Sequence, residues 1–359
     1  MTDKNHPDET VLTIVQGKGT LPREQAGRNI HYDDASLSNY KMVQKGDFII
    51  HLRSFEGGLE MANENGIVSP AYTILRGKKP HSSRFYEAYF HTDEFVNHVL
   101  SKSVEGIRDG RQISYDAFKR LGLPYCSPSE QAKIAELFSV LTKRIEKQTV
   151  LVDSLKKYKR GLHKLVFIKN RKPSWEKSAL HDIASFCGGG TPSKDVSSYW
   201  DGEIGWISSS DIQEEWIDDI SVTRRITKKA IDNSATKLCP EGTIAIVSRV
   251  GVGKVAIIPE SLCTSQDFTN ITSITGNTHY MAYQIAFRMK LEAMKTQGTS
   301  IKGVTADTIK SMVLDIPPLE EQKKIADMLT AFDSYIKRAV YELNLFLTMK
   351  KALLQQLFI

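Results

Sequence analysis

The sequence predicts a mixed α/β protein of the α+β class: two globular domains separated by two long helices that form an antiparallel coiled coil with an approximate two-fold internal repeat. Three observations lead to this expectation. Much of the chain is an internal repeat of two copies, and each copy contains a long stretch with an apolar helical seam. The regions between these stretches combine strand-like and helix-like patterns. A length of 359 residues fits two or three domains.

The duplication is clearest in the helical part of each copy. Residues 130–168 align without a gap with residues 321–359, at a constant spacing of 191 positions. The same spacing aligns 113–119 with 304–310 upstream. A period this long indicates a duplicated unit consisting of a domain and a helix, and it is far longer than the period of a solenoid repeat.

Both copies of the helix carry apolar residues at alternating steps of four and three, which is the a/d pattern of a coiled coil. The predicted seam contains Ile134, Phe138, Leu141, Ile145, Val152 and Leu155 in the first copy, and Ile325, Leu329, Phe332, Ile336, Leu343 and Phe346 in the second. Lys159 and Lys350 interrupt both seams at the same place. We expect their charged ends to reach water while Tyr158 and Met349 fill the gap, with a role in fixing the register as the alternative.

The helix starts and directions follow from local signals. Ser127, Pro128 and Glu130 fit the N-cap, first and third positions of a helix, and Pro317-Pro318 marks the second start. Each helix of about 40 residues is about 60 Å long, so a small domain cannot bury its apolar stripe. The other copy is the obvious partner, and antiparallel packing would return Ile359 to the first domain.

We predict four segments: a first globular domain over 1–126, a first helix and linker over 127–172, a second domain over 173–316 and a second helix over 317–359. Strand-like stretches are Gly46–Ile50, Ala71–Leu75, Gly242–Val247 and Val255–Ile258, and helix-like stretches are Arg84–Leu100 and Tyr280–Met294. The first domain is shorter at its N-terminal side. The opening glycine-rich and tryptophan-containing segment of the second domain has no evident counterpart in it.

Charge and composition narrow the function classes. The formal net charge is +6, and Glu130–Lys172 alone holds 12 Lys/Arg against 4 Asp/Glu. This basic segment could lie near nucleic acid or face an acidic partner, and the alternative is a solvated helix face. No apolar run could span a bilayer and no signal peptide is evident, so we expect a cytoplasmic protein. The four cysteines form no CxxC pair, which favours reduced thiols and no metal site.

The sequence does not match the residue spacing of the enzyme signatures that we compared with it. Gly251–Lys254 resembles the end of a phosphate-binding loop, but Ser248 occupies the position of its first glycine and Val255 follows the lysine. The histidines form no HExxH or HxE pattern, and no Asn-Pro-Pro-aromatic methyltransferase signature occurs. We therefore expect no catalytic residue in this chain.

Several short motifs occur in this duplicated frame: Asn39–Lys41, Lys45–Ile49 and Gly66–Tyr72 in the first domain, Gly189–Ser193, Tyr199–Asp211 and Ser265–Phe268 in the second, and Pro317–Gln322 at the second helix start. With these motifs the chain resembles the specificity subunit of a type I restriction–modification enzyme. The resemblance covers nearly the whole chain from about Leu37 on, and the combination is specific although each piece is modest.

The resemblance implies that each globular domain is a target-recognition domain for one half of a bipartite site in double-stranded DNA. The helices would set the distance between the halves and dock two methyltransferase subunits. S-adenosylmethionine, Mg and ATP would then be held by partner subunits, including a separate motor and restriction subunit, and this chain would bind no cofactor. The alternative is an orphan or decoy scaffold that binds methyltransferase subunits without productive DNA reading.

DNA recognition needs cations for phosphates and polar side chains for base edges, on loops that fit a groove. The candidate DNA-binding residues are Arg53, Ser54, Arg111, Thr191, Ser193, Lys194, Arg249, Lys254 and Lys302. Arg111 and Lys302 are the best candidates because a cation recurs at the same place in both copies. The alternatives are solvated surface cations and, for 191–194, a plain turn.

Overall fold

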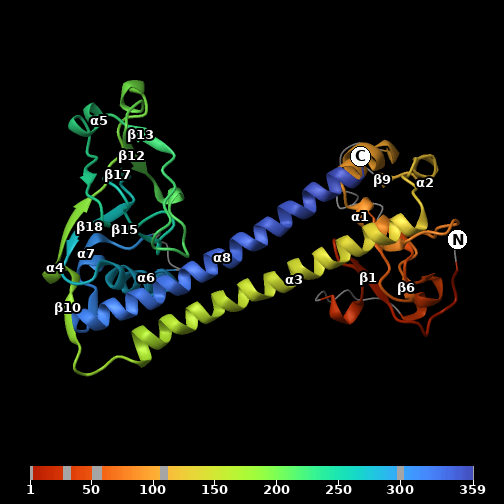
Figure 1. The fold of residues 1–359 in the computed structure, drawn as a ribbon, viewed down its shortest axis with the longest axis horizontal. Coiled ribbons are helices and arrows are strands. Elements are labelled where there is room, and N and C mark those ends of the chain that lie inside the picture. Colours follow the sequence, from red (N-terminus) through yellow and green to blue (C-terminus); the bar gives the residue numbers. More distant parts are fainter. Residues whose placement is uncertain (1–2, 27–33, 51–58, 106–111, 297–302, 359) are drawn as a thin grey trace. The chain divides into compact units, whose positions relative to one another are not determined.

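The computed structural model describes residues 3–26, 34–50, 59–105, 112–296 and 303–358. It is a mixed helix and sheet protein with two long helices, as predicted: α3 (Pro128–Lys164) and α8 (Leu319–Leu357), shown in Figure 1. The chain divides into two compact units, unit 1 (Met1–Leu151 with Val340–Ile359) and unit 2 (Val152–Ala339). Each unit therefore contains the start of one long helix and the end of the other.

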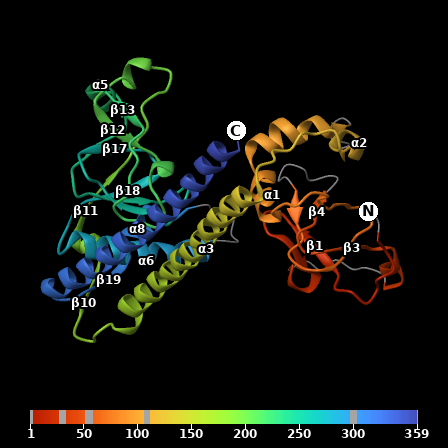
Figure 2. The same cartoon turned by 45° about the vertical axis from the view of Figure 1, so that its right-hand side comes forward.

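Unit 1 contains short strands in small antiparallel sheets. The pairs are β1 (Leu12–Val15) with β2 (Gly19–Pro22), β3 (Lys41–Val43) with β6 (Gly66–Val68), and β8 (Val104–Glu105) with β9 (Gln112–Ile113). A three-stranded sheet has the order β5 (Glu60–Met61), β4 (Phe48–Ile50), β7 (Thr73–Leu75). The helices include α1 (Ser83–Phe90), a π-helical turn (Glu94–Val99), α2 (Tyr115–Phe118), the first part of α3 and the last part of α8. In two views α1 lies beside the start of α3 (Figures 1 and 2).

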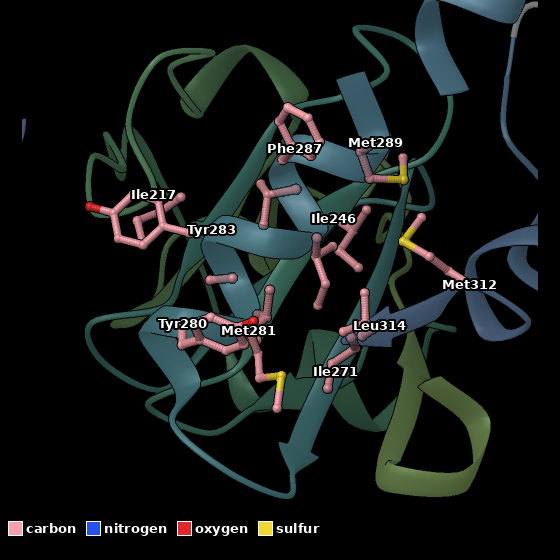
Figure 3. Close-up of a cluster of buried hydrophobic side chains, with 14 of the residues drawn as sticks. Ile217, Ile246, Ile271, Tyr280, Met281, Tyr283, Phe287, Met289, Met312 and Leu314 are labelled. Carbon is pink, nitrogen blue, oxygen red and sulfur yellow. The ribbon is translucent and has the colours of Figure 1, made fainter. Parts of the chain in front are cut away.

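Unit 2 contains two four-stranded sheets. One has the order β11 (Ala184–Gly188), β18 (Phe268–Ile274), β15 (Ile244–Val247), β16 (Val255–Ile257). The other has the order β13 (Arg224–Ile226), β12 (Ile204–Ile207), β17 (Leu262–Thr264), β14 (Leu238–Cys239). A separate pair joins β10 (Glu176–Ala179) to β19 (Val313–Ile316), and the short helices are α4 (Leu180–Ile183), α5 (Lys228–Asp232) and α7 (Ala306–Lys310). Helix α6 (Thr278–Thr296) supplies Tyr280, Met281 and Tyr283 to the core with Ile246 and Ile271 of the first sheet (Figure 3).

The strands of unit 1 repeat those of unit 2 in the same register. Phe48 of β4 lies opposite Leu75 of β7 and Met61 of β5. In unit 2 the residues 196 positions later, in β15, β18 and β16, form the same pairs. The pair β3–β6 recurs in the same way as β14–β17. Gly46 and Gly242 precede the central strands with φ of 93° and 80°, a region that favours glycine because it has no Cβ.

This register corrects one expectation from the sequence. The tryptophan-containing strand β12 has a counterpart in unit 1, because Val11 bridges Ile67 in parallel where Trp206 of β12 pairs with Cys263. Backbone pairing sets the place of a strand, so a valine can stand where the other copy has tryptophan. Among the residues that the structure describes, no strand of unit 1 takes the place of β11.

Both long helices start with the same buried hydrogen bonds. Gln131 accepts the N–H of Ser82 (2.8 Å), and Gln322 accepts the N–H of Asn277 (2.8 Å). Each glutamine amide also donates to the carbonyl oxygen five residues earlier in the chain. Ser82 and Asn277 cap α1 and α6, so in both copies the long helix is attached to the N-terminus of a domain helix. The predicted start of α3 is confirmed, since Ser127 Oγ accepts the N–H of Glu130 (3.3 Å).

The end of each long helix packs into the unit that holds the start of the other. In unit 1, the ring of Phe358 lies 5.1 Å from that of Phe85 in α1 and 6.1 Å from that of Phe138 in α3. In unit 2, Phe167 follows α3 and lies 6.0 Å from Tyr280 of α6. Phe167 and Phe358 are 191 positions apart, so they are equivalent residues of the two copies. Each packs into the core of the unit that contains the start of the other long helix.

Contacts within each unit pair the two helices in opposite directions. In unit 1, Lys350 Nζ donates to Thr142 Oγ1 (3.0 Å), and the Gln148 amide donates to Glu342 (3.3 Å). As the number rises along α3 it falls along α8, so the two segments are antiparallel there. Unit 2 shows the same order, with contacts from Lys159 to Asp333 and, beyond α3, from Lys172 to Glu321. The twelve seam residues named above are buried or half-buried, whereas Leu357, at the end of the predicted seam, is exposed.

The expectation for Lys159 is wrong. Its ammonium is directed to the protein: it forms an ion pair with Asp333 (Nζ–Oδ1 2.7 Å), and the two side chains are 12% and 4% exposed. Tyr158 fills no gap, since it is 71% exposed. The Lys159–Asp333 contact in unit 2 and the Lys350–Thr142 contact in unit 1 are equivalent. The two lysines are 191 positions apart, and so are Asp333 and Thr142. The sequence could not show the pair because only one copy carries the aspartate.

Candidate nucleic-acid interface

A hollow of 450 Å³ lies at one edge of the β11–β18–β15–β16 sheet in unit 2. Four segments that are distant in sequence line it, namely Phe186–Gly188 at the end of β11, Ser248-Arg249 after β15, Gln266 with Phe268-Thr269 around the start of β18, and Gly303–Ala306 with Lys310 of α7. The antiparallel order of the sheet brings the end of β11, the end of β15 and the start of β18 to this edge. The hollow therefore forms only when the sheet brings these segments together.

The chemistry of the hollow is cationic and polar. Arg249 and Lys310 line it, and no carboxylate does so among the residues that the structure describes. Arg249 is exposed, and the ammonium of Lys310 lies 5.9 Å from the centre of the Phe186 ring. The hydroxyl of Thr305 and the amide of Gln266 add hydrogen-bonding groups. Such a set can bind phosphate oxygens and base edges.

The segment of the hollow that begins at Gly303 adjoins one of the best sequence candidates. The N–H of Val304 donates to the carbonyl of Ser248 (2.8 Å), which holds the segment after Gly303 against the turn that carries Arg249. A Cβ on Gly303 would lie 3.0 Å from that carbonyl oxygen, so a side chain there would crowd the turn. Lys302 is the next residue in the chain, and it lies outside the described residues.

The glycine-rich loop before β12 packs against the protein itself. A Cβ on Gly189 would lie 2.0 Å from the carbonyl oxygen of Ser265, so glycine is required for this close approach. Thr191 Oγ1 donates to the Gln266 side chain beside the hollow. Ser193 and Lys194 are exposed on the same loop. Their predicted role in DNA contact stays a prediction.

The other candidates lie in different settings. Lys254 is half-buried and its ammonium donates to the carbonyl of Ser209 (2.9 Å), so it is engaged within the protein. Arg53, Ser54 and Arg111 lie outside the described residues, as does Lys302. The spacing of 196 that relates the strands also separates Arg53 from Arg249 in the sequence.

Lys310 and Gln266 line the hollow but were not among the sequence candidates. Lys310 lies 191 positions after Lys119, the same sign of a repeated cation that singled out Arg111 and Lys302. Gln266 lies within the motif Ser265–Phe268, but no chemistry pointed to it. Their place in the hollow depends on contacts between distant loops, which the sequence does not display.

The hollow also includes one member of a thiol pair. Cys187 on β11 and Cys239 on β14 have their Sγ atoms 3.5 Å apart, although 52 residues separate them. The hydrogen bond with Cys239 lowers the pKa of the Cys187 thiol below its usual range. Within the described part of the chain, no group of histidine, cysteine and carboxylate side chains could hold a metal ion. No helix there is both long and apolar enough to cross a membrane.

The comparisons with known proteins agree with this picture. The family model described as "Type I restriction modification DNA specificity domain" matches residues 173–344. Residues 173–344 are therefore similar to the DNA specificity domain of type I restriction–modification systems. A type I specificity subunit from Methanocaldococcus jannaschii is 34% identical over 167 residues, which are 45% of this chain and 39% of that protein. One from Escherichia coli is 28% identical over 256 residues, which are 67% of this chain and 62% of that protein.

Solved structures of this family share the fold. The type I S subunit from M. genitalium has a TM-score of 0.60 at 13% identity, and it covers 100% of this chain and 96% of its own. A chain from a study of complex assembly and conformational transition in the type I R-M system has a TM-score of 0.59 at 14% identity, with 100% and 94% covered. The recognition made from the sequence is thus confirmed at the level of the family.

Proposed function

We propose that this chain is a sequence-specific DNA-binding specificity subunit of a type I restriction–modification enzyme, without a catalytic site of its own. The observation that carries the proposal is the hollow with Arg249 and Lys310, which belongs to a DNA specificity domain. The lining includes two cations and no carboxylate among the described residues, which favours a polyanion, and hydroxyl and amide groups beside the cations suit base edges. Double-stranded DNA is therefore the ligand.

The target is bipartite in this proposal. The segments 1–126 and 173–316 each read one half, and the strand register that recurs in both units supports two related reading domains. Helices α3 and α8 pair along their length as an antiparallel coiled coil and hold the domains apart. The antiparallel contacts within unit 1 and within unit 2 support this pairing.

The helix pair also docks two methyltransferase subunits, and a motor and restriction subunit completes the enzyme. S-adenosylmethionine, Mg and ATP belong to these partners. Support for the assembly comes from the names of the relatives, which are subunits of type I restriction enzymes, and from the exposed apolar and basic side chains of α3. A scaffold that occupies methyltransferases without reading DNA has no observation in its favour.

Substitutions at the hollow test the proposal. Arg249→Ala and Lys310→Ala are compared with the wild type and with Lys228→Ala, an exposed lysine of α5 outside the hollow. A phosphate contact lowers affinity for all sequences and reduces the salt slope by about 1, whereas a base contact costs about 1–3 kcal/mol for one half-site. Affinity is measured over a salt series. Binding that is independent of salt, or unchanged in both hollow variants, contradicts the proposal.

A further inference from the structure

A segment of unit 2 crosses from the sheets to both long helices. It is Gln213–Asp219, between β12 and β13, and we call it the strap. Lys156 of α3 forms an ion pair with Glu215 (3.0 Å), and Lys337 of α8 forms one with Asp218 (2.6 Å). The strap therefore binds both helices through opposite charges.

The ring of Trp216 is the centre of this contact. The ammonium of Lys159 lies 4.5 Å from the ring centre and that of Lys337 lies 5.3 Å from it, so one lysine from each helix faces the same indole. Lys159 also donates to the carbonyl of Glu215 and pairs with Asp333. Because cation–π contacts strengthen where water is excluded, this buried ammonium adds to the hold on the strap.

The strap is anchored on the sheet side as well. Ile217 is 4% exposed and belongs to the buried cluster that includes Tyr283 of α6 (Figure 3). Its carbonyl accepts the N–H of Ile257 in β16 (2.7 Å). The strap is thus an attachment of the unit 2 reading domain to the helices in addition to the contacts of α6.

The corresponding connection in unit 1 is different. The connection between its β1 and β2 is a turn around Gly17, much shorter than the connection that carries the strap. At the position in unit 1 that corresponds to the strap, there is a groove of 490 Å³. Its lining includes Gly17, Glu87, Thr142 and Lys350. Among the described residues, Gly17 is the only contribution of the β1–β2 connection to that groove.

We propose that the strap is a positioning element that holds the second reading domain at a fixed orientation on the helix pair, with Trp216 and Asp218 as its positioning residues. The inference rests on the proposed function. Without the strap the domain is held mainly through α6 and the start of α8, and the strap restricts its rotation about these contacts. One base pair of spacer moves a half-site by about 3.4 Å and about 34°, so a fixed domain makes the enzyme strict about spacer length.

The test measures affinity for duplexes with the preferred spacer and with one base pair fewer or more. Trp216→Ala and Asp218→Lys lower the discrimination between these spacers by about tenfold, and they leave the sequence preference of each half-site unchanged. The double variant Asp218→Lys/Lys337→Asp restores discrimination because the ion pair re-forms with reversed charges. Glu241→Gln, an exposed carboxylate outside the strap, behaves like the wild type.

Hydrogen exchange provides a structural readout that does not depend on DNA. The Ile257 amide, which donates to the strap, exchanges faster in Trp216→Ala than in the wild type. Faster exchange with unchanged spacer discrimination overturns the positioning role alone. If the wild type binds no DNA sequence specifically, the proposed function itself fails, and this role fails with it.

Discussion

Replacing Lys159 with methionine removes one member of the buried ion pair between α3 and α8 in unit 2. Asp333, whose side chain is 4% exposed, then keeps a carboxylate whose remaining hydrogen-bond donor among the described groups is the hydroxyl of Tyr283 (2.9 Å). Burial raises the pKa of Asp333 and lowers that of Lys159, because each charge alone is disfavoured in this setting.

The expected loss in the free energy of unfolding is about 3–5 kcal/mol, because breaking a buried pair leaves an uncompensated charge. The double variant Lys159→Met/Asp333→Leu returns to within about 1 kcal/mol of the wild type, since apolar residues of similar volume replace a buried pair at little cost. Lys350→Met is the matched control. Lys350 is bonded to a neutral hydroxyl, that of Thr142, so its loss costs about 0.5–1.5 kcal/mol.

Urea unfolding provides the assay. All 4 tryptophans of the chain lie in unit 2, so tryptophan fluorescence follows that unit, and circular dichroism follows the helices of both. A loss below about 1 kcal/mol for Lys159→Met, or a double variant no more stable than the single one, would refute the reasoning, because a solvated surface pair behaves in that way.

Two further predictions concern buried polar groups. Burial lowers the pKa of His163 from 6.5 to about 3, so the fold favours the neutral ring, and its contribution is complete above pH 6.5 and declines as the pH falls below that. The wild type should lose about 2 kcal/mol of stability between pH 8 and pH 5 relative to His163→Leu, and equal pH dependence of the two would contradict this. Gln322→Met should cost about 2–4 kcal/mol in urea unfolding, because the N–H of Asn277 and the carbonyl of Pro317 lose their partner. Lys323→Met, at an exposed neighbour, should cost less than about 0.5 kcal/mol.

The long helices could be predicted from the sequence because their signals are local. Steps of four and three identify a buried stripe whatever it packs against, and a serine and proline fix a helix start. The polar contacts between the two helices could not be predicted in this way, because they join residues that are distant in sequence. Lys159 was expected in water because its partner Asp333 has a threonine, Thr142, as its counterpart in the other copy, so the repeat gave no sign of an ion pair.

The strand duplication was hidden for a different reason. The spacing between copies is 196 in the strands around Phe48 and Ile244 but 191 in the helices, because the connecting loops differ in length. Loops tolerate such changes at small cost in free energy. Register is fixed by backbone hydrogen bonds, so Val11 can occupy the place of Trp206, and side-chain similarity alone does not reveal the match.

The candidate site was predictable in part. Arg249 was identified as a cation after a strand, and the structure places it in the hollow. Lys310 and Gln266 were missed because they reach the hollow from a helix and a loop that approach Arg249 only after folding. Lys254 carried the same sequence signal as Arg249, yet it donates to a carbonyl of the protein, a difference that depends on where η9 (Ser209–Asp211) packs.

Selection of duplexes from a random pool, with the chain bound to its methyltransferase subunits, tests the central claim most directly. Two specific half-sites separated by a constant number of unspecified base pairs should be enriched, with affinity that weakens as salt rises. Recovery of no common sequence, or of a single uninterrupted one, would contradict the proposal of two reading domains on one pair of helices.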